Sequence, residues 1–399
     1  MTISATTQGI KPGVCLSTAK PANPFDGQVI YMTDVDQTAV WDGTSWTVLA
    51  PIAGGRNVVI NGAMQVAQRG TSTASITAGG YYTADRWFTN IDNTIGTWTQ
   101  SIENDAPTGS GFIKSLKMLV TTANSALDAN DFLNIDQRLE GQNLQQFLKG
   151  TASAKQFSIS FWVKSNVTGT YIAELRDASN TRAVSASYTV AASATWEKKT
   201  ITFPADTTGA FANDNSGALR LGFGLAMGST YTSGTLATTW VSITQSNRYA
   251  GQTNVSATLN NYWQITGVQL EAGAVATPFE FEDIGTTLAK CQRYFIRFGS
   301  PSLNAAENFG LGLTYSSTQA LIQLRPPVTM RVLPTSIDSL ALSVDDASVA
   351  PSVTSLTINQ GGTNVVLVFA TVASGLTQFR PIFLRGNTSG CHVSLSAEL

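Results

Sequence analysis

The stretch Phe157-Ser-Ile-Ser-Phe-Trp-Val-Lys164 begins as a strict alternation of apolar and polar residues. In an extended chain this alternation places Phe157, Ile159 and Phe161 on one face and Trp162 on the other. A period of two predicts a β-strand that packs one face against a second layer. We therefore expect this stretch to be a strand of a β-sandwich.

Similar runs lie on both sides of this stretch, and Gly, Asn and Asp residues separate them at intervals typical of a sandwich. The other expected strands between 57 and 283 are Val58–Ile60, Thr97–Ile102, Ser115–Val120, Thr170–Arg176, Lys198–Phe203, Leu219–Leu225 and Trp263–Leu270. A short helix is expected at Asn143–Lys149. Its apolar face holds Leu144, Phe147 and Leu148, and Gly150 follows at the position of a C-cap.

Residues 1–55 form a smaller unit, in which turn residues separate three short apolar runs. The runs at 27–33, 38–41 and 45–49 predict strands, with turns at 34–37 and 42–43. Tyr31, Trp41 and Trp46 are expected to supply most of the core. We predict a small β-meander, followed by a linker at 51–55.

Residues 286–399 form a third unit that opens with a short helix, Thr286–Gln292. Its expected strands are Gly310–Tyr315, Ala320–Leu324, Asn364–Phe369, Phe379–Leu384 and His392–Leu395. The predicted fold class is therefore all-β, in three units: a meander at 1–55, a sandwich at 56–285 and a C-terminal sandwich at 286–399.

The composition narrows the class of protein. Charged residues make up 13% of the chain and nearly cancel to a net charge of −2, so nucleic acid is not an expected partner. The hydrophobic content of 43% and eight tryptophans exclude a disordered polar chain. The N-terminus lacks a secretory pattern, and no apolar run is long enough to span a bilayer, so we expect no membrane insertion. A virion protein that is assembled in a host cytoplasm and released by lysis would have these features.

Several motifs in order resemble a known kind of domain. Asn57–Gly62, Gln65–Gly70 and Tyr82–Trp87 look like the opening of a phage-encoded jelly-roll domain, a family similar to carbohydrate-binding modules. The match continues at Ser158–Ser165, Thr195–Thr202, Ile265–Gly273, Thr277–Glu280 and Cys291–Phe295, and so covers about 57–295. The pattern of 27–46 resembles a module of phage fibre and baseplate proteins, and 327–334 and 397–399 resemble C-terminal parts of such fibres.

This resemblance implies a phage tail-fibre, or receptor-binding, protein whose 56–285 unit is a jelly-roll. It implies location in the virion, assembly as a homotrimer and attachment to other tail or baseplate proteins through 1–55. Residues 286–399 would then be distal and face the receptor, a glycan of the bacterial host surface. Two alternatives stay open: a structural collar or baseplate component without receptor contact, and a capsule-degrading hydrolase.

No metal or cofactor is expected. Modules of this shape often hold calcium through acidic residues in the first and last strands, but this chain has Gln65, Thr266 and Gly267 at the matching positions. Asp34 and Asp36 are interpreted as turn residues. Three widely spaced cysteines, Cys15, Cys291 and Cys391, indicate neither a disulfide framework nor a zinc site, although a bridge between the last two is conceivable. Buried thiols are the simpler interpretation.

The residues do not favour an enzyme, and no catalytic residue is assigned. The only histidine is His392, and no phosphate loop or dinucleotide motif is present. A glycosidase needs only two carboxylates. The candidate acidic groups are Asp128, Asp131, Asp136 and Glu140; Glu174 and Asp177; Glu280, Glu282 and Asp283; and Asp345 with Asp346. Each has a structural explanation; Glu174, for example, is expected to point outward from its strand, and the pair 345–346 to form a turn.

Sugar binding requires aromatic faces beside amides and carboxylates. Tyr231, Trp240 and Tyr249 lie among Asn, Gln and Thr in the polar, Gly-punctuated segment 226–262, which is predicted to form long loops. They are the candidate ligand-binding residues, although each ring could instead anchor its loop. Asp85-Arg86-Trp87 is interpreted as a partly buried ion pair beside a core tryptophan.

Overall fold

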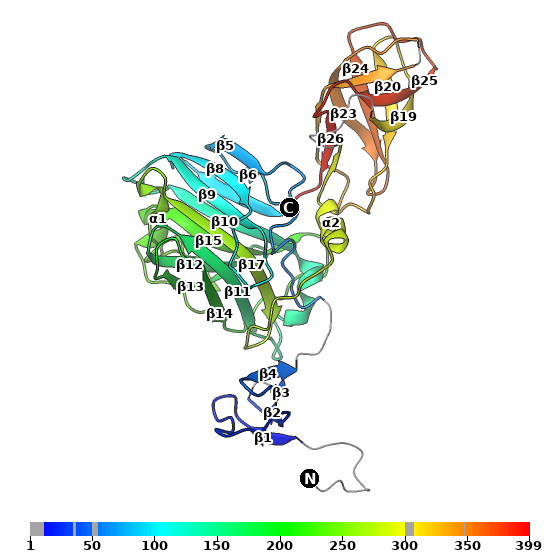
Figure 1. Ribbon diagram of the computed structural model, residues 1–399. Coiled ribbons are helices and arrows are strands. Elements are labelled where there is room, and N and C mark those ends of the chain that lie inside the picture. The colour runs from blue at the N-terminus through cyan, green and yellow to red at the C-terminus, as the bar shows by residue number, and fades with distance from the viewer. Residues whose placement is uncertain (1–11, 35–36, 50–54, 94, 300–306, 347) are drawn as a thin grey trace, which may run out of the picture.

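A computed structural model of the protein describes residues 12–34, 37–49, 55–93, 95–299, 307–346 and 348–399. Figure 1 shows a small N-terminal sheet, a large central sandwich and a smaller C-terminal β-unit that follow one another along the chain. The described residues are almost entirely strands, turns and loops, which confirms the predicted all-β class. None of the helices in these residues is long and apolar enough to cross a membrane.

The central sandwich consists of two sheets of antiparallel strands. The seven-stranded sheet contains, in spatial order, β16 (Val241–Ser242), β13 (Arg182–Val190), β12 (Gly169–Asp177), β15 (Gly217–Met227), β10 (Phe132–Glu140), β7 (Trp87–Asp92) and β6 (Gly80–Tyr81). The six-stranded sheet contains β14 (Glu197–Phe203), β11 (Phe157–Ser165), β17 (Tyr262–Ala272), β9 (Ser115–Thr122), β8 (Thr97–Glu103) and β5 (Ser72–Ile76).

Aromatic side chains fill the space between these sheets. Phe157, Ile159 and Phe161 of β11 are fully buried, as their alternation predicts. The Phe161 ring lies 5.0 Å from Phe223 of β15 and 5.1 Å from Tyr188 of β13. Burial of each such side chain contributes about 1.5–3 kcal/mol to folding. The alternation in the sequence therefore locates the inner layer of the sandwich.

In this unit one local prediction is wrong and another is correct only in part. Val58–Ile60 is irregular, because its backbone bonds to separate partners: Val58 donates to the carbonyl of Leu270 and Ile60 to the side chain of Gln137. The helix expected at 143–149 is a 3₁₀-helix, η1 (Gly141–Phe147), which ends when Leu148 adopts the left-handed conformation (φ 50°). Leu148 therefore leaves the apolar face and is 43% exposed.

The segment 228–252 covers part of the outer face of the seven-stranded sheet. It contains α1 (Ser229–Thr232) and η2 (Gln245–Asn247), and α1 lies at one edge of the sandwich in Figure 1. Glu174 of β12, expected to point outward from its strand, is only 2% exposed because this segment lies over it. Arg248 donates to both carboxylate oxygens of Glu174, at 2.6 and 2.7 Å, and the Tyr249 hydroxyl donates at 3.1 Å. The outward direction predicted for Glu174 is therefore correct, and the covering segment buries the side chain on that face.

The N-terminal sheet contains β1 (Gly13–Cys15), β2 (Val29–Met32), β3 (Gln37–Trp41) and β4 (Trp46–Leu49). The meander of the last three was predicted, whereas β1, which runs parallel to β2, was not. Ile30, Met32 and Ala39 form the buried core with Trp46 packed against it, so the core predicted for Tyr31 and Trp41 is wrong. Asp36 and residues 51–54 of the expected linker lie outside the described residues.

The C-terminal unit begins with α2 (Ile284–Gln292) and continues with two sheets that share one core. The three-stranded sheet contains β18 (Phe295–Phe298), β26 (His392–Ser396) and β21 (Ser336–Leu340). The six-stranded sheet contains β22 (Leu342–Asp345), β25 (Pro381–Gly386), β19 (Asn308–Thr314), β20 (Gln319–Leu324), β24 (Val366–Val372) and β23 (Val353–Gly361). Cys291 and Cys391 are buried free thiols, and Cys15 is also free.

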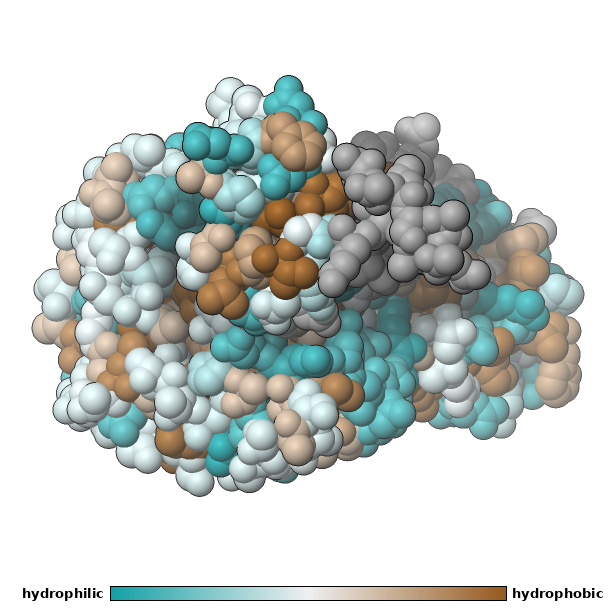
Figure 2. All heavy atoms as spheres, turned by 90° about the horizontal axis from the view of Figure 1, so that it is seen from below, coloured by the Kyte–Doolittle hydropathy of each residue, from teal (hydrophilic) through white to brown (hydrophobic). Residues whose placement is uncertain are grey.

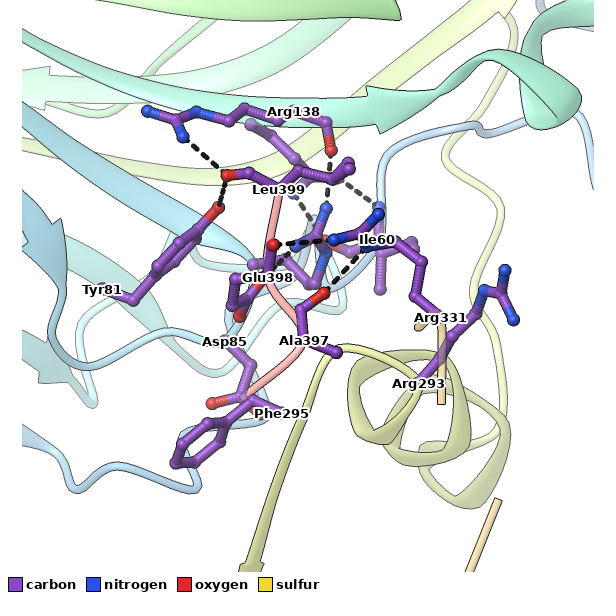
Figure 3. Close-up of polar contacts among 12 residues, drawn as sticks. Ile60, Tyr81, Asp85, Arg138, Arg293, Phe295, Arg331, Ala397, Glu398 and Leu399 are labelled. Atoms are coloured by element: carbon purple, nitrogen blue, oxygen red, sulfur yellow. Dashed lines mark hydrogen bonds and ion pairs between the residues drawn. The ribbon is translucent and has the colours of Figure 1, made fainter. Parts of the chain in front are cut away.

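After β26 the chain returns to the central sandwich, where Figure 3 shows the tail Ala397–Leu399 among polar side chains. The carboxylate of Glu398 pairs with Arg86, whose side chain is fully buried, and with Arg69 at 3.1 Å. Arg138 donates to the carbonyl of Leu399 at 2.6 Å. The expected pair of Asp85 with Arg86 does not form, because Asp85 lies 3.7 Å from Arg69 instead. The adjacent Trp87 is in the core, as predicted.

Arg331 of the C-terminal unit completes this junction. It donates to the carbonyls of Ala397 and Glu398 and to the carbonyl of Asn215 in the sandwich. Near α2, Arg293 forms two hydrogen bonds of 2.9 Å with Glu140. The C-terminal unit is thus attached to the sandwich at the helix and at the tail.

The buried ion pair between Glu174 and Arg248 is expected to hold the covering segment 228–252 on the sheet, and a substitution tests this. The substitution Glu174→Gln leaves a buried guanidinium without its counter-charge, and we expect a loss of about 3–5 kcal/mol in the free energy of unfolding. Urea denaturation measures the effect. The exposed pair of Glu282 with Lys290 provides the control: Glu282→Gln should cost less than about 1 kcal/mol. If Glu174→Gln and Glu282→Gln lose the same free energy of unfolding, the pair of Glu174 with Arg248 does not hold the covering segment.

The tail generates a second test. Glu398→Gln leaves Arg86 buried without its carboxylate, so we expect the tail to detach and the segment after β26 to become accessible to proteases. Limited proteolysis, read by mass spectrometry, measures this. A double variant, Arg86→Met with Glu398→Leu, removes both charges and should restore part of the protection. If Glu398→Gln is cut no faster than the wild type, the tail does not depend on this ion pair.

Candidate ligand-binding face

Three arginines lie side by side on the outer face of the seven-stranded sheet. Arg138 of β10 is opposite Arg220 of β15, and Arg220 is opposite Arg176 of β12. Their sequence neighbours Leu139, Leu175, Leu219 and Leu221 are buried in the core, so the pleat directs the arginines outward. All three residues are partly exposed. We refer to Arg138, Arg176 and Arg220 as the arginine row.

The charges of the arginine row are only partly compensated. In the part of the chain that the structure describes, no hydrogen bond or ion pair reaches a side-chain nitrogen of Arg176 or Arg220, and the Nε of Arg176 is buried without a partner. The Nε of Arg138 is 3.6 Å from the carboxylate of Asp136. Burial lowers the pKa of Arg220, and the like charge of Arg138 lowers it further. The row thus presents guanidinium groups with free hydrogen-bonding capacity.

Asp136 lies two residues before Arg138, on the same face of β10. It is 1% exposed, and its Oδ1 has no hydrogen-bond partner. Burial raises the pKa of Asp136 to about 6, against the opposing effect of Arg138 and Arg220. Gly222 of β15 separates Asp136 from Glu174 on the next strand. Because Glu174 is held by Arg248, these two carboxyl groups do not form a free acid–base pair.

Aromatic rings adjoin the arginine row at its Arg138 end. The guanidinium of Arg138 lies 4.0 Å from the centre of the Phe88 ring, and Tyr81 meets Phe88 edge-on at 5.0 Å. Both aromatic residues are partly exposed, as is Asn90 on the same face of β7. We define the open face as the arginine row together with Tyr81, Phe88 and Asn90. It combines apolar ring surface with hydrogen-bonding side chains, the mixture that ligand sites use.

The three predicted ligand-binding residues lie apart from this row and not all together. Tyr231 and Tyr249 belong to the covering segment, and both contact Phe132 beneath it, at 4.9 and 5.5 Å between ring centres. Tyr249 is fully buried and holds Asn134 and Glu174 through its hydroxyl. Trp240 is 8% exposed, packs on Phe157 and donates to a backbone carbonyl. Tyr249 and Trp240 anchor their loops, and Tyr231 alone keeps a partly exposed ring.

Most other candidate carboxylates have structural partners. Asp177 contacts Lys149 at 2.6 Å, and Asp345 pairs with Arg385. Acidic side chains that accept hydrogen bonds from backbone N–H groups are Asp131, Glu280, Asp283 and Asp346. Among the described residues, no group of three His, Cys, Asp or Glu is placed to hold a metal ion. His392 lies 3.0 Å from Asp338.

A second aromatic cluster lies over the other sheet. Phe112, Phe279 and Phe281 contact one another at 4.9–5.1 Å between ring centres and line a pocket with Trp162 and Lys198. Phe281 is 55% exposed. Sequence reasoning missed this cluster and the arginine row alike, because both depend on which strands and loops become neighbours. The outward position of Trp162, opposite Phe161, was the one available signal.

Comparisons with known proteins give likenesses of fold alone. No family model matches the chain, and no curated protein matches its sequence. Solved structures that match include a tailspike enzymatically active domain of bacteriophage CBA120 (16% identity, TM-score 0.29, covering 54% of this chain and 21% of that one). Others are a carbohydrate-binding module in complex with β-1,4-galactotriose (11%, 0.28, covering 54% and 99%) and a family 11 module of a Clostridium thermocellum cellulase (9%, 0.25, covering 54% and 94%). At these values, the likenesses assign neither ligand nor activity to this chain.

Proposed function

We propose that the protein is a phage tail-fibre subunit that attaches the virion to the bacterial surface by binding a polysaccharide on the open face of the seven-stranded sheet. The observation that carries this proposal is the position of Phe88 and Tyr81 beside Asn90 and the arginine row. Apolar faces of sugar rings pack on aromatic rings, while their hydroxyls need hydrogen-bonding side chains. The open face offers both.

The surface composition supports the same role. In Figure 2, seen from the side of the N-terminal sheet, residues of intermediate hydropathy cover much of the surface, together with hydrophilic patches and a group of apolar residues near the middle of the view. Residues of intermediate hydropathy, such as Ser, Thr and Gly, therefore meet much of the solvent on this side, in keeping with a charged fraction of only 13%. In the proposed fibre, 1–55 attaches to tail proteins and three copies assemble. Several linked copies make weak individual sites sufficient.

One observation favours the structural alternative, a collar or baseplate component. The outer face of the C-terminal six-stranded sheet exposes Leu311 (62%), Leu313 (52%) and Phe383 (45%), and Leu311 is directly opposite Phe383. Contiguous apolar surface of this kind is typical of protein contacts rather than of sugar contacts. In that role, the C-terminal unit would meet a protein neighbour instead of the receptor.

We propose binding without hydrolysis. A glycosidase needs one carboxylic acid and one free carboxylate across the scissile bond. Asp136 has a free oxygen and a raised pKa, but its neighbour Glu174 is held by Arg248 and Tyr249. Release of reducing ends from host polysaccharide by the purified protein would contradict this part of the proposal.

The test of the proposal is binding of the purified, full-length protein to surface polysaccharides isolated from a panel of bacteria. Phe88→Ala should weaken binding by roughly 3- to 10-fold, because ring contacts contribute about 0.5–1.5 kcal/mol. Phe281→Ala, on the other side of the sandwich, is the matched control and should bind like the wild type. Circular dichroism confirms that both variants are folded. If the wild type binds neither the polysaccharides nor intact cells, or if the two variants lose binding equally, the open face is not the receptor site.

A further inference from the structure

The arginine row is an unusual arrangement for a sheet. Like charges directly opposite one another on neighbouring strands destabilise the sheet, and Arg220 faces an arginine on both sides. A buried donor without a partner, such as the Nε of Arg176, adds a further cost. Two fully or almost fully buried arginines of the sandwich, by contrast, have carboxylate partners: Arg86 has Glu398 and Arg248 has Glu174. Arg138 has Asp136 at 3.6 Å and the Leu399 oxygen at 2.6 Å as partners. Among the described residues no hydrogen bond or ion pair reaches the side-chain nitrogens of Arg176 and Arg220, which leaves these two guanidiniums available to an anion from outside the chain.

We propose that the arginine row binds oxyanion groups of an acidic polysaccharide, that is, sugar carboxylates or phosphates. This inference rests on the proposed function and names the ligand class of the same face. A guanidinium presents a planar fork of N–H donors that matches the oxygens of a carboxylate or phosphate. The row crosses β10, β15 and β12, whose spacing is about 4.8 Å per strand, so a polymer lying along the row meets successive guanidiniums.

The aromatic residues extend the site. Because Arg138 lies over Phe88, the ring contact and the charge contact are adjacent. The guanidinium of Arg138 occupies one face of the Phe88 ring, so a sugar contacts the parts of Phe88 and Tyr81 that stay exposed, while an acidic group of the same or the next sugar meets Arg220. The tail of the chain borders this end, since the carbonyl of Leu399 accepts from Arg138 and from Tyr81.

Asp136 gives the site a dependence on pH. The charged groups that face it are Arg138, Arg220 and Glu174. When ionised, Asp136 attracts the two arginines and repels an incoming anion. Its pKa is raised to about 6, so the carboxyl group becomes neutral below that pH and leaves both guanidiniums to the ligand. Sulfate does not titrate in this range, and its affinity should therefore rise as the pH falls from 7 to 5.

In the first experiment the full-length protein is titrated with sulfate and, separately, with inorganic phosphate, and calorimetry measures the affinity for each anion. The wild type should bind both anions, and Arg220→Gln should bind them at least about 10-fold more weakly, because a charge-assisted fork is lost. Lys198→Gln removes one positive charge from the opposite sheet and should bind like the wild type. The melting temperature of Arg220→Gln should be unchanged or higher, since the substitution relieves repulsion. A structural arginine would show the opposite change in melting temperature.

The second experiment uses polygalacturonate, its carboxyl-reduced form and a phosphate-bearing teichoic acid. Preference for an acidic polymer over the carboxyl-reduced one, abolished by Arg220→Gln, supports the inference, and the preferred polymer identifies carboxylate or phosphate as the group bound. If Arg220→Gln binds the anions and polymers as the wild type does, the inference is wrong. Retained binding of neutral polysaccharide that depends on Phe88 would still support the proposed function. Failure of the wild type to bind any polysaccharide or cell would instead overturn the proposed function.

Discussion

The packing of aromatic side chains between the two central sheets is the constraint on which the rest of the structure depends. Phe161, Phe223 and Trp263 fill the inner layer, with ring centres 5.0–5.9 Å apart along the series. Since successive residues of a strand point to opposite faces, every polar residue between these apolar ones must lie outside. The outer faces consequently collect charges, and each charge must find a partner, a cover or a ligand.

The seven-stranded sheet shows these three outcomes on one surface. Glu174 has a cover and a partner, because the segment 228–252 places Arg248 and Tyr249 over it. Asp136 is covered without a full set of hydrogen bonds, and its raised pKa reflects that burial. In the arginine row only Arg138 contacts a carboxylate, that of Asp136 at 3.6 Å, and no ion pair holds Arg176 or Arg220 among the described residues, which distinguishes the row from the ion pairs that hold the fold together.

The strands with clear alternation could be predicted from the sequence, and β11 and β17 lie where their patterns indicate. The strand β10 was missed, because Asp136 and Arg138 interrupt its apolar residues and suggest a polar segment. The arginine row could not be predicted from the sequence, for a different reason. Arg138, Arg176 and Arg220 become neighbours only through strand register, which no local pattern specifies. Likewise, the burial of Glu174 depends on a segment more than 50 positions later in the chain.

The contact of Arg86 with Glu398 joins residues 312 positions apart in the sequence. During synthesis the strands of the sandwich are complete long before Glu398 leaves the ribosome. Arg86 must therefore keep water or another anion as its partner while the C-terminal unit is being made. The pairing of this guanidinium is therefore among the last steps of folding. A chain whose synthesis stops early would carry an unpaired positive charge at the junction between the sandwich and the C-terminal unit.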